Sequence, residues 1–188
     1  MRLLDVLFGR TRVAKPKTDA LLGIATATLA LEAKLNITAT GKAGLCLRPV
    51  VSSFFTALER EVQEILEVSG RAAGTKFRTQ KDDLGFEWVV LEDPDFEDLV
   101  TTLYAVQQEV IEQGFGPQLL AAVFGFKGGE ETLYWVYSYK RGKFYPFAPR
   151  AEQKRDNALE LQVSAAMAQE LPIEQSLEQW YALWGLPM

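Results

Sequence analysis

The stretch FEWVVLEDPDFEDLVTTLYAVQQEVIEQG, residues 86–114, decides the fold class because a strand pattern runs directly into a helix pattern. Its first six residues are mostly β-branched or aromatic, which favours a strand. Phe86, Trp88 and Val90 share one side of that strand, whereas Glu87 lies on the other. Asp95 then predicts a helix N-cap, and apolar residues recur every three or four positions until Gly114.

Strand and helix patterns also flank this stretch on both sides. Gly41 and Gly44 predict a turn before the first strand. We expect strands over residues 45–48, 76–80, 119–126, 132–140 and 144–147. Pro146 and Pro149 either place the last strand at a sheet edge or end it. We expect helices over residues 18–24, 29–35, 52–70 and 157–167, with Asn157 as a cap, and a final short helix around 180–184 after a Ser176–Gln179 capping box.

The order of these elements predicts an α+β protein with an antiparallel sheet packed by helices. From Leu45 to Phe126 the order is β-α-β-β-α-β, which is the ferredoxin-like order. Without the first strand, the remaining order is similar to a secretion-chaperone-like layout. The sequence leaves both layouts open. Residues 18–188 are expected to form the single α+β domain.

Residues 1–17 form an amphipathic, basic segment ahead of that domain, with a net charge of +4. Leu3, Leu4, Leu7 and Phe8 share one face of a short helix pattern, and Arg10 and Arg12 follow it. The apolar face would insert at a membrane surface while the arginines meet anionic lipid. The alternative is that the helix docks on the protein's own body. The segment is short, so any membrane contact is expected to be weak.

The residue counts narrow the possible chemistry. The chain has no histidine, which excludes Ser-His-Asp and Cys-His nucleophile systems and imidazole-dependent zinc sites. It has one cysteine, Cys46, so no internal disulfide forms, and we expect a buried structural thiol. We also expect the acidic run over residues 92–98 to stabilise a helix start. The prediction is a non-enzymatic protein with no catalytic or metal-binding residue and no cofactor.

Charge and hydropathy predict a cytoplasmic protein. The net charge is −5 and the isoelectric point is about 5.0, which makes nucleic acid an unlikely partner. The opening apolar stretch is short and Asp5 interrupts it, so we expect no signal peptide. The uncharged stretch over residues 20–31 is too short to cross a bilayer. A lipid-bound N-terminal segment would hold the protein at the inner membrane face.

The region over residues 134–150 is the densest candidate site because aromatic and basic residues are interleaved in it. A β-hairpin whose rings pack the core, a protein-docking surface and a single-stranded RNA-binding surface are all compatible with this composition. For the docking surface we predict the residues Tyr139, Lys140, Arg141, Phe144, Tyr145, Phe147, Arg155 and Asp156.

Five segments together resemble one family, the PspA-associated protein PspAB family. They are LLDVLFGR at 3–10, GFGPQLL at 114–120, YKRGKFYPFAP at 139–149, RDNALELQ at 155–162 and WYALWGLP at 180–187. The resemblance implies an accessory role beside PspA, the coiled-coil protein of the phage-shock-like envelope-stress response, whose relatives bind and remodel membranes. It carries over no catalytic residue, and the oligomeric state stays open.

Overall fold

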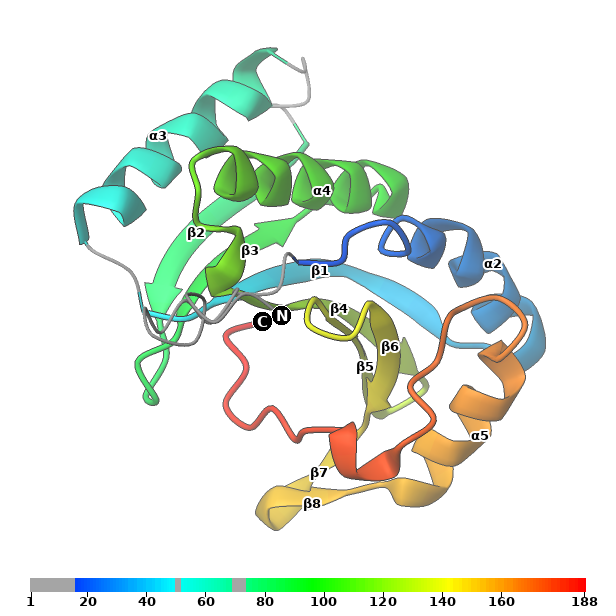
Figure 1. Ribbon diagram of the computed structural model, residues 1–188. Coiled ribbons are helices and arrows are strands. Elements are labelled where there is room, and N and C mark those ends of the chain that lie inside the picture. The colour runs from blue at the N-terminus through cyan, green and yellow to red at the C-terminus, as the bar shows by residue number, and fades with distance from the viewer. Residues whose placement is uncertain (1–15, 50–51, 69–73) are drawn as a thin grey trace, which may run out of the picture.

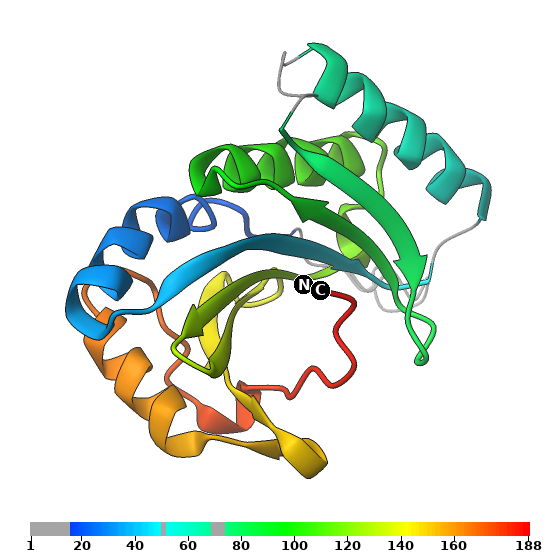
Figure 2. The same cartoon turned by 180° about the vertical axis from the view of Figure 1, so that it is seen from behind.

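A six-stranded antiparallel sheet, wrapped by helices, forms the body of the protein (Figures 1 and 2). The computed structural model describes residues 16–49, 52–68 and 74–188. The helices of this part are α2 (Gly23–Leu35), α3 (Ser52–Val68), α4 (Phe96–Glu112) and α5 (Asn157–Met167). The sheet strands are β1 (Thr38–Leu47), β2 (Lys76–Lys81), β3 (Glu87–Glu92), β4 (Leu119–Gly128), β5 (Glu131–Ser138) and β6 (Lys143–Phe147). Short elements are η1 (Gly116–Gln118), β7 (Pro149–Arg150), η2 (Ala151–Gln153), β8 (Lys154–Arg155) and η3 (Leu177–Gln179).

The strand order confirms the α+β prediction and distinguishes the two layouts. The order is β2-β3-β1-β4-β5-β6, so β3 lies between the two strands that α3 connects. This is the split βαβ arrangement of the ferredoxin-like order. Because β1 sits inside the sheet and pairs with both β3 and β4, it cannot be left out of the topology. The β5–β6 hairpin extends the sheet beyond β4, and β6 lies at the edge as predicted.

Strand β1 is longer than its sequence pattern predicts. It begins at Thr38, and Gly41 and Gly44 lie within it rather than in a turn before it. Gly41 has a φ of 72°, and the register with β4 shifts between Ala39 and Ala43, so a bulge interrupts the strand there. A side chain at Gly41 would meet the Asp93 carbonyl oxygen at 2.6 Å, which explains why glycine occupies this position.

Both faces of the sheet are covered at β3, so alternate residues along this strand do not alternate between buried and exposed positions. Trp88 and Glu87 lie on opposite faces as predicted, yet Glu87 is only 3 % exposed. Its carboxylate forms an ion pair with Lys81, with 3.3 Å between Glu87 Oε1 and Lys81 Nζ. A charge buried on a strand is therefore compensated by a neighbouring cation on β2.

The helix boundaries follow local capping, with three corrections. Asp95 caps α4 as predicted, because its side chain accepts hydrogen bonds from the Glu97 and Asp98 N–H groups at 2.9 and 3.1 Å. The two short helices expected over 18–24 and 29–35 are one helix, which includes all of 29–35 but not residues 18–22. One helix, α2, begins at Gly23, where the glycine costs little because it stands at the end of the helix.

The cap of α5 is Asp156 rather than Asn157, since the Asp156 carboxylate accepts the Leu159 N–H at 2.9 Å. The final helix around 180–184 is also wrong. Only the 3₁₀ turn η3 forms, without a side-chain cap from Ser176, and the following chain is irregular.

The C-terminal segment, residues 168–188, covers the sheet face opposite α2 and α4; we call it the tail (Figures 1 and 2). Ile173 forms a parallel bridge with Phe144 on β6. Arg78 on β2, at the other edge of the sheet, donates to the Pro187 carbonyl oxygen. The tail therefore crosses the whole width of the sheet.

Candidate functional site

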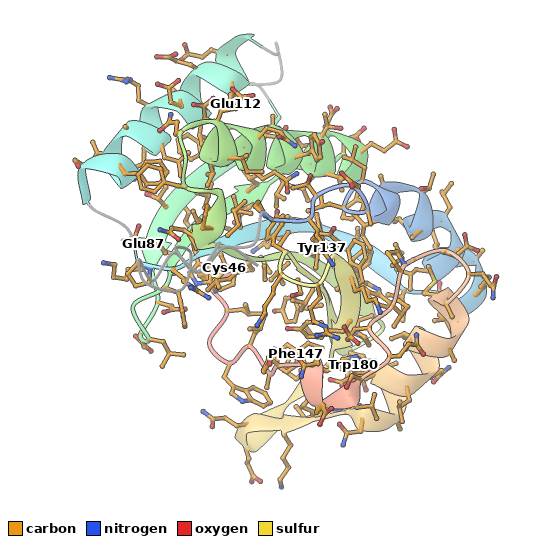
Figure 3. All side chains as sticks on the ribbon, viewed as in Figure 1. Cys46, Glu87, Glu112, Tyr137, Phe147 and Trp180 are labelled. Carbon is orange, nitrogen blue, oxygen red and sulfur yellow. The ribbon has the colours of Figure 1, made fainter. Side chains whose placement is uncertain are left out.

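The aromatic rings predicted to dock a partner lie inside the protein. Tyr139, Phe144 and Phe147 are 0 % exposed, and Tyr145 is 3 % exposed. Figure 3 places Phe147 beside Trp180 in the layer between the hairpin and the tail. Of the three interpretations of the aromatic-basic region, a core-packed hairpin is what these positions show.

Specific contacts on both faces of the hairpin hold these rings. On the helix face, the Tyr139 hydroxyl donates to Gln107 Oε1 on α4 at 2.5 Å, and burial raises the pKa of Tyr139 well above its usual value. On the tail face, Tyr145 stacks with Trp180 at 6.5 Å between ring centroids. Phe147 meets Trp184 edge to face at 5.0 Å. The hairpin thus joins the helices to the tail.

The basic residues of the predicted docking site make internal contacts as well. Arg141 Nε donates to the Glu174 carboxylate in the tail, and this bond lowers the pKa of Glu174 to about 2. Arg155 Nε donates to Glu160 Oε1 at 2.9 Å, and its guanidinium lies 5.3 Å from the centre of the Phe147 ring. Arg155 also donates to the Trp180 carbonyl oxygen. These two arginines therefore fix the tail onto the hairpin.

Asp156 and Lys140 complete the predicted docking set. Asp156 caps α5 and also accepts from Arg150 Nε at 3.1 Å. The Leu159 N–H, more than Arg150, lowers the pKa of Asp156. Lys140 is the one predicted docking residue whose side chain is classed as exposed. The docking prediction stays a prediction, but most of its members are committed to contacts within the chain.

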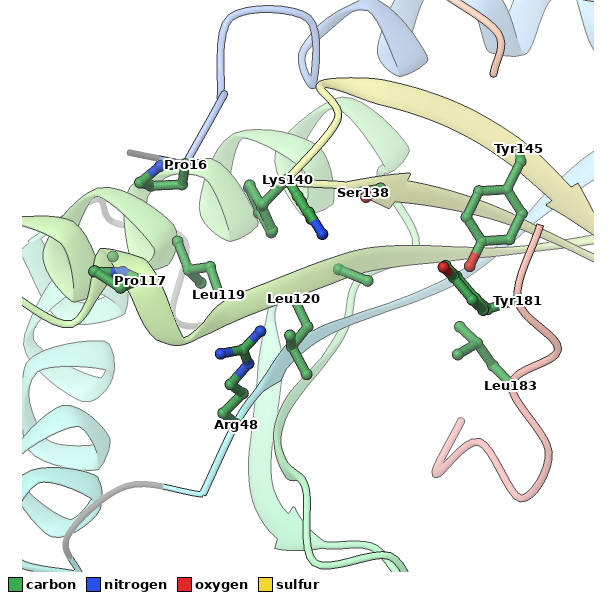
Figure 4. A pocket seen from close by; sticks show the side chains of 13 residues that line it. Pro16, Arg48, Pro117, Leu119, Leu120, Ser138, Lys140, Tyr145, Tyr181 and Leu183 are labelled. Atoms are coloured by element: carbon green, nitrogen blue, oxygen red, sulfur yellow. The ribbon is translucent and has the colours of Figure 1, made fainter. Parts of the chain in front are cut away.

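An apolar cavity of about 340 Å³ opens between the start of β4, the end of β5 with the turn after it, and the tail. Figure 4 shows Tyr145, Tyr181 and Leu183 at one end, and Pro16 and Pro117 at the other. Leu119, Leu120 and Ala121 form its floor, and Arg48 and Lys140 also line it. The cavity is large enough for several apolar side chains.

Helices α2 and α5 pack against each other, and each exposes uncharged residues that the sequence patterns did not reveal, beside the exposed Glu32 and Lys34 of α2. Leu29 on α2 is 71 % exposed, and Leu161 on α5 is 50 % exposed. The other exposed, uncharged residues of these two helices include Thr26, Ala33, Ala158 and Ala165. We call these six residues the α2–α5 surface. An apolar surface on adjacent helices is typical of a protein-binding site.

Cys46 is buried, and Asp93 of the acidic run over residues 92–98 makes hydrogen bonds within the chain. Burial raises the pKa of the Cys46 thiol to about 12, so the thiolate is disfavoured. Asp93 accepts the Asp95 N–H at 2.8 Å and is hydrogen-bonded to Thr75. Among residues 16–49, 52–68 and 74–188, no group of three His, Cys, Asp or Glu side chains is placed to hold a metal ion.

The predicted membrane-binding residues Leu3, Leu4, Leu7, Phe8, Arg10 and Arg12 lie outside the described residues. Among the helices that the structure does describe, none combines the length and the apolar character needed to cross a bilayer.

The fold and surface define an antiparallel α+β protein built on a split βαβ unit, with a hairpin covered by the tail and exposed leucines on the adjacent helices α2 and α5. The model of the family described as PspAB, PspA associated protein B, matches residues 1–188, so the chain belongs to this family. This confirms the resemblance seen in the sequence motifs. No curated protein and no solved structure matches the chain.

Proposed function

We propose that the chain is a non-enzymatic accessory protein that binds PspA on the cytoplasmic side of the membrane, and that the α2–α5 surface is the contact. The family description, PspA associated protein B, supports the partner. The exposed leucines of two adjacent helices support the surface and are the observation on which the proposal depends most. Burial of most of the hairpin directs the contact away from it.

The chemistry of the α2–α5 surface fits a helical partner. Leu29 and Leu161 offer branched apolar contacts, while Thr26, Ala33, Ala158 and Ala165 are small. Small residues beside leucines let a second helix approach closely and place its own apolar side chains between them. The resemblance implies that PspA is a coiled-coil protein, so its helices are the expected counterpart.

Charged residues at the side of this surface would set the register of the partner. Lys34 on α2 forms an ion pair with Glu170 at 3.2 Å and donates to the Ala166 carbonyl oxygen at 3.3 Å. Both charged side chains are about half exposed, so they remain open to a partner. Exposed charges at an interface rim affect association rate and specificity more than affinity.

A binding titration with purified PspA tests the proposal. The double variant Leu29→Glu and Leu161→Glu should weaken binding at least about tenfold, because it places charges in the centre of the proposed contact. Leu84→Glu is the matched control, since Leu84 is 78 % exposed in the turn between β2 and β3. It should leave the dissociation constant unchanged.

The results of this titration distinguish an error in the proposed partner from an error in the proposed contact surface. If the wild-type chain does not bind PspA, the proposed partner is wrong. If the double variant and Leu84→Glu bind like the wild type, the α2–α5 surface is not the contact. Lys140→Glu then tests the exposed residue that remains from the predicted hairpin site.

A further inference from the structure

The cavity beside Pro16 has an apolar lining, and Pro16, where the described part of the chain begins, is itself one of the lining residues. Leu119 and Tyr145 in its wall are buried, while Leu120, Ala121 and Leu183 are partly buried. A second cavity of about 410 Å³ adjoins this one, and Pro16, Gly116 and Pro117 line both. Pro16 is the first described residue, so the preceding fifteen residues are attached where the two cavities meet.

Backbone contacts fix this point of attachment. The Lys17 N–H donates to the Tyr139 carbonyl oxygen at 3.0 Å, and the Tyr137 hydroxyl donates to the Lys17 carbonyl oxygen at 3.1 Å. Lys17 also packs on Gly142, where a Cβ atom would lie 2.8 Å from the lysine side chain. These contacts hold Pro16 at the rim of the cavity.

We propose that the cavity is the docking site of the chain's own N-terminal segment, with Leu3, Leu4, Leu7 and Phe8 as the side chains that fill it. The sequence of the segment has the apolar spacing expected of a helix face, and the cavity offers an apolar lining. Seven residues separate Phe8 from Pro16, and an extended chain of that length reaches roughly 25 Å, which spans the distance to either cavity. Tethering raises the effective concentration of the segment at the cavity to the order of millimolar.

One charge of the segment has a counterpart in the cavity lining. Arg48 and Lys140 line the cavity, and Asp5 lies among the apolar residues of the segment in the sequence. Arg10, Arg12 and Lys15 follow those apolar residues in the sequence, so the apolar lining would not have to accommodate them. Docking would bring the Asp5 carboxylate towards the two cations of the lining.

Docking and membrane binding exclude each other, because both use the same four apolar side chains. The docked segment would keep its leucines from lipid, and lipid would have to draw them out of the cavity. The cavity thereby regulates access of the segment to a membrane surface. This inference is independent of the proposed contact with PspA, which uses a different surface.

Hydrogen exchange of the full-length chain tests the docking. Without lipid, the amides of residues 3–8 should exchange at least about tenfold more slowly than in a synthetic peptide of residues 1–15. Phe8→Glu should bring their exchange to the rate of the peptide. Leu120→Glu, which changes the cavity and not the segment, should do the same, and Leu183→Glu serves if Leu120→Glu fails to fold. Leu84→Glu is the control and should retain the protection.

Three results would overturn the inference. The first is exchange in the wild-type chain at the rate of the free peptide. The second is protection that appears only after phosphatidylglycerol vesicles are added, which would make lipid the ligand of these residues. Protection that survives both Leu120→Glu and Leu183→Glu in folded protein would likewise place the segment elsewhere.

Discussion

The two faces of the sheet are covered by different kinds of structure. On one face, helices supply the cover, and Phe96 of α4 packs edge to face on Phe124 and Phe126 at 6.0 and 5.4 Å. On the other face the cover is the tail, which has no helix longer than η3 among its residues. Helices satisfy their own backbone hydrogen bonds, whereas an irregular segment needs partners from elsewhere.

The tail finds those partners at charged and aromatic side chains. Arg155 and Arg78 donate to the carbonyl oxygens of Trp180 and Pro187, and Trp180 Nε1 donates to the Glu174 carbonyl oxygen at 2.9 Å. The difference between the faces suggests that the helix face depends on packed apolar area, whereas the tail face depends on a few polar anchors as well. This comparison can be tested one face at a time.

The largest expected effect comes from removing one buried ring on each face. Phe124→Ala on the helix face and Trp180→Ala on the tail face should each lower the free energy of unfolding by about 3–5 kcal/mol, since both leave a cavity. Urea denaturation followed by circular dichroism measures both losses. Equal losses would show that the tail is as much part of the cooperative fold as α4. A Trp180→Ala loss below about 1 kcal/mol would show that the tail opens independently.

The next largest effect concerns the anchor at Arg155. Arg155→Ala should cost about 3 kcal/mol, because it leaves the Glu160 carboxylate buried without its cation and frees the Trp180 carbonyl oxygen. Glu160 is 1 % exposed and still accepts the Ala148 N–H at 2.8 Å. Adding Glu160→Gln should recover part of the loss in urea denaturation, since the uncompensated charge is gone. A double variant as unstable as Arg155→Ala would assign the cost to lost packing on Phe147 instead.

The contrast between the two faces also shows what the sequence could reveal. Helix α4 was predictable because Asp95 caps it and its apolar residues recur with the helical period. The tail was not, because an irregular segment held by Arg155 and Arg78 leaves no period to detect. Trp180 and Trp184 therefore looked like a helix face, although they pack on Tyr145 and Phe147.

Exposure was the other property that the sequence could not supply. The alternating rings of β5 and β6 have the same pattern whether a tail covers them or a partner does, so Phe144 and Tyr145 were predicted as docking residues. Leu29 shows the converse, since an exposed leucine on α2 has the same sequence spacing as a buried one. Only the tertiary packing of α5, β6 and the tail decides between these cases.

The smallest effect, and the most specific to the tail face, is its response to acid. Arg141 holds the pKa of Glu174 at about 2, well below the ordinary value of 4.5. A lowered pKa in the folded state contributes stability above the unfolded value, and that contribution is lost as the pH falls from about 4.5 towards 2. Glu174→Gln keeps the shape and can still accept the Ser176 N–H, but it removes the charge that Arg141 pairs with. It should therefore be less stable than the wild type at pH 7, with a difference that shrinks on acidification.

Thermal denaturation across this pH range measures the difference in stability. Glu178→Gln changes an exposed carboxylate in the same tail, so it is the control with little expected effect on stability. A Glu174→Gln difference that stays constant across the range would mean that Arg141 does not anchor the tail through charge, and the polar half of the comparison would then rest on Arg155 and Arg78.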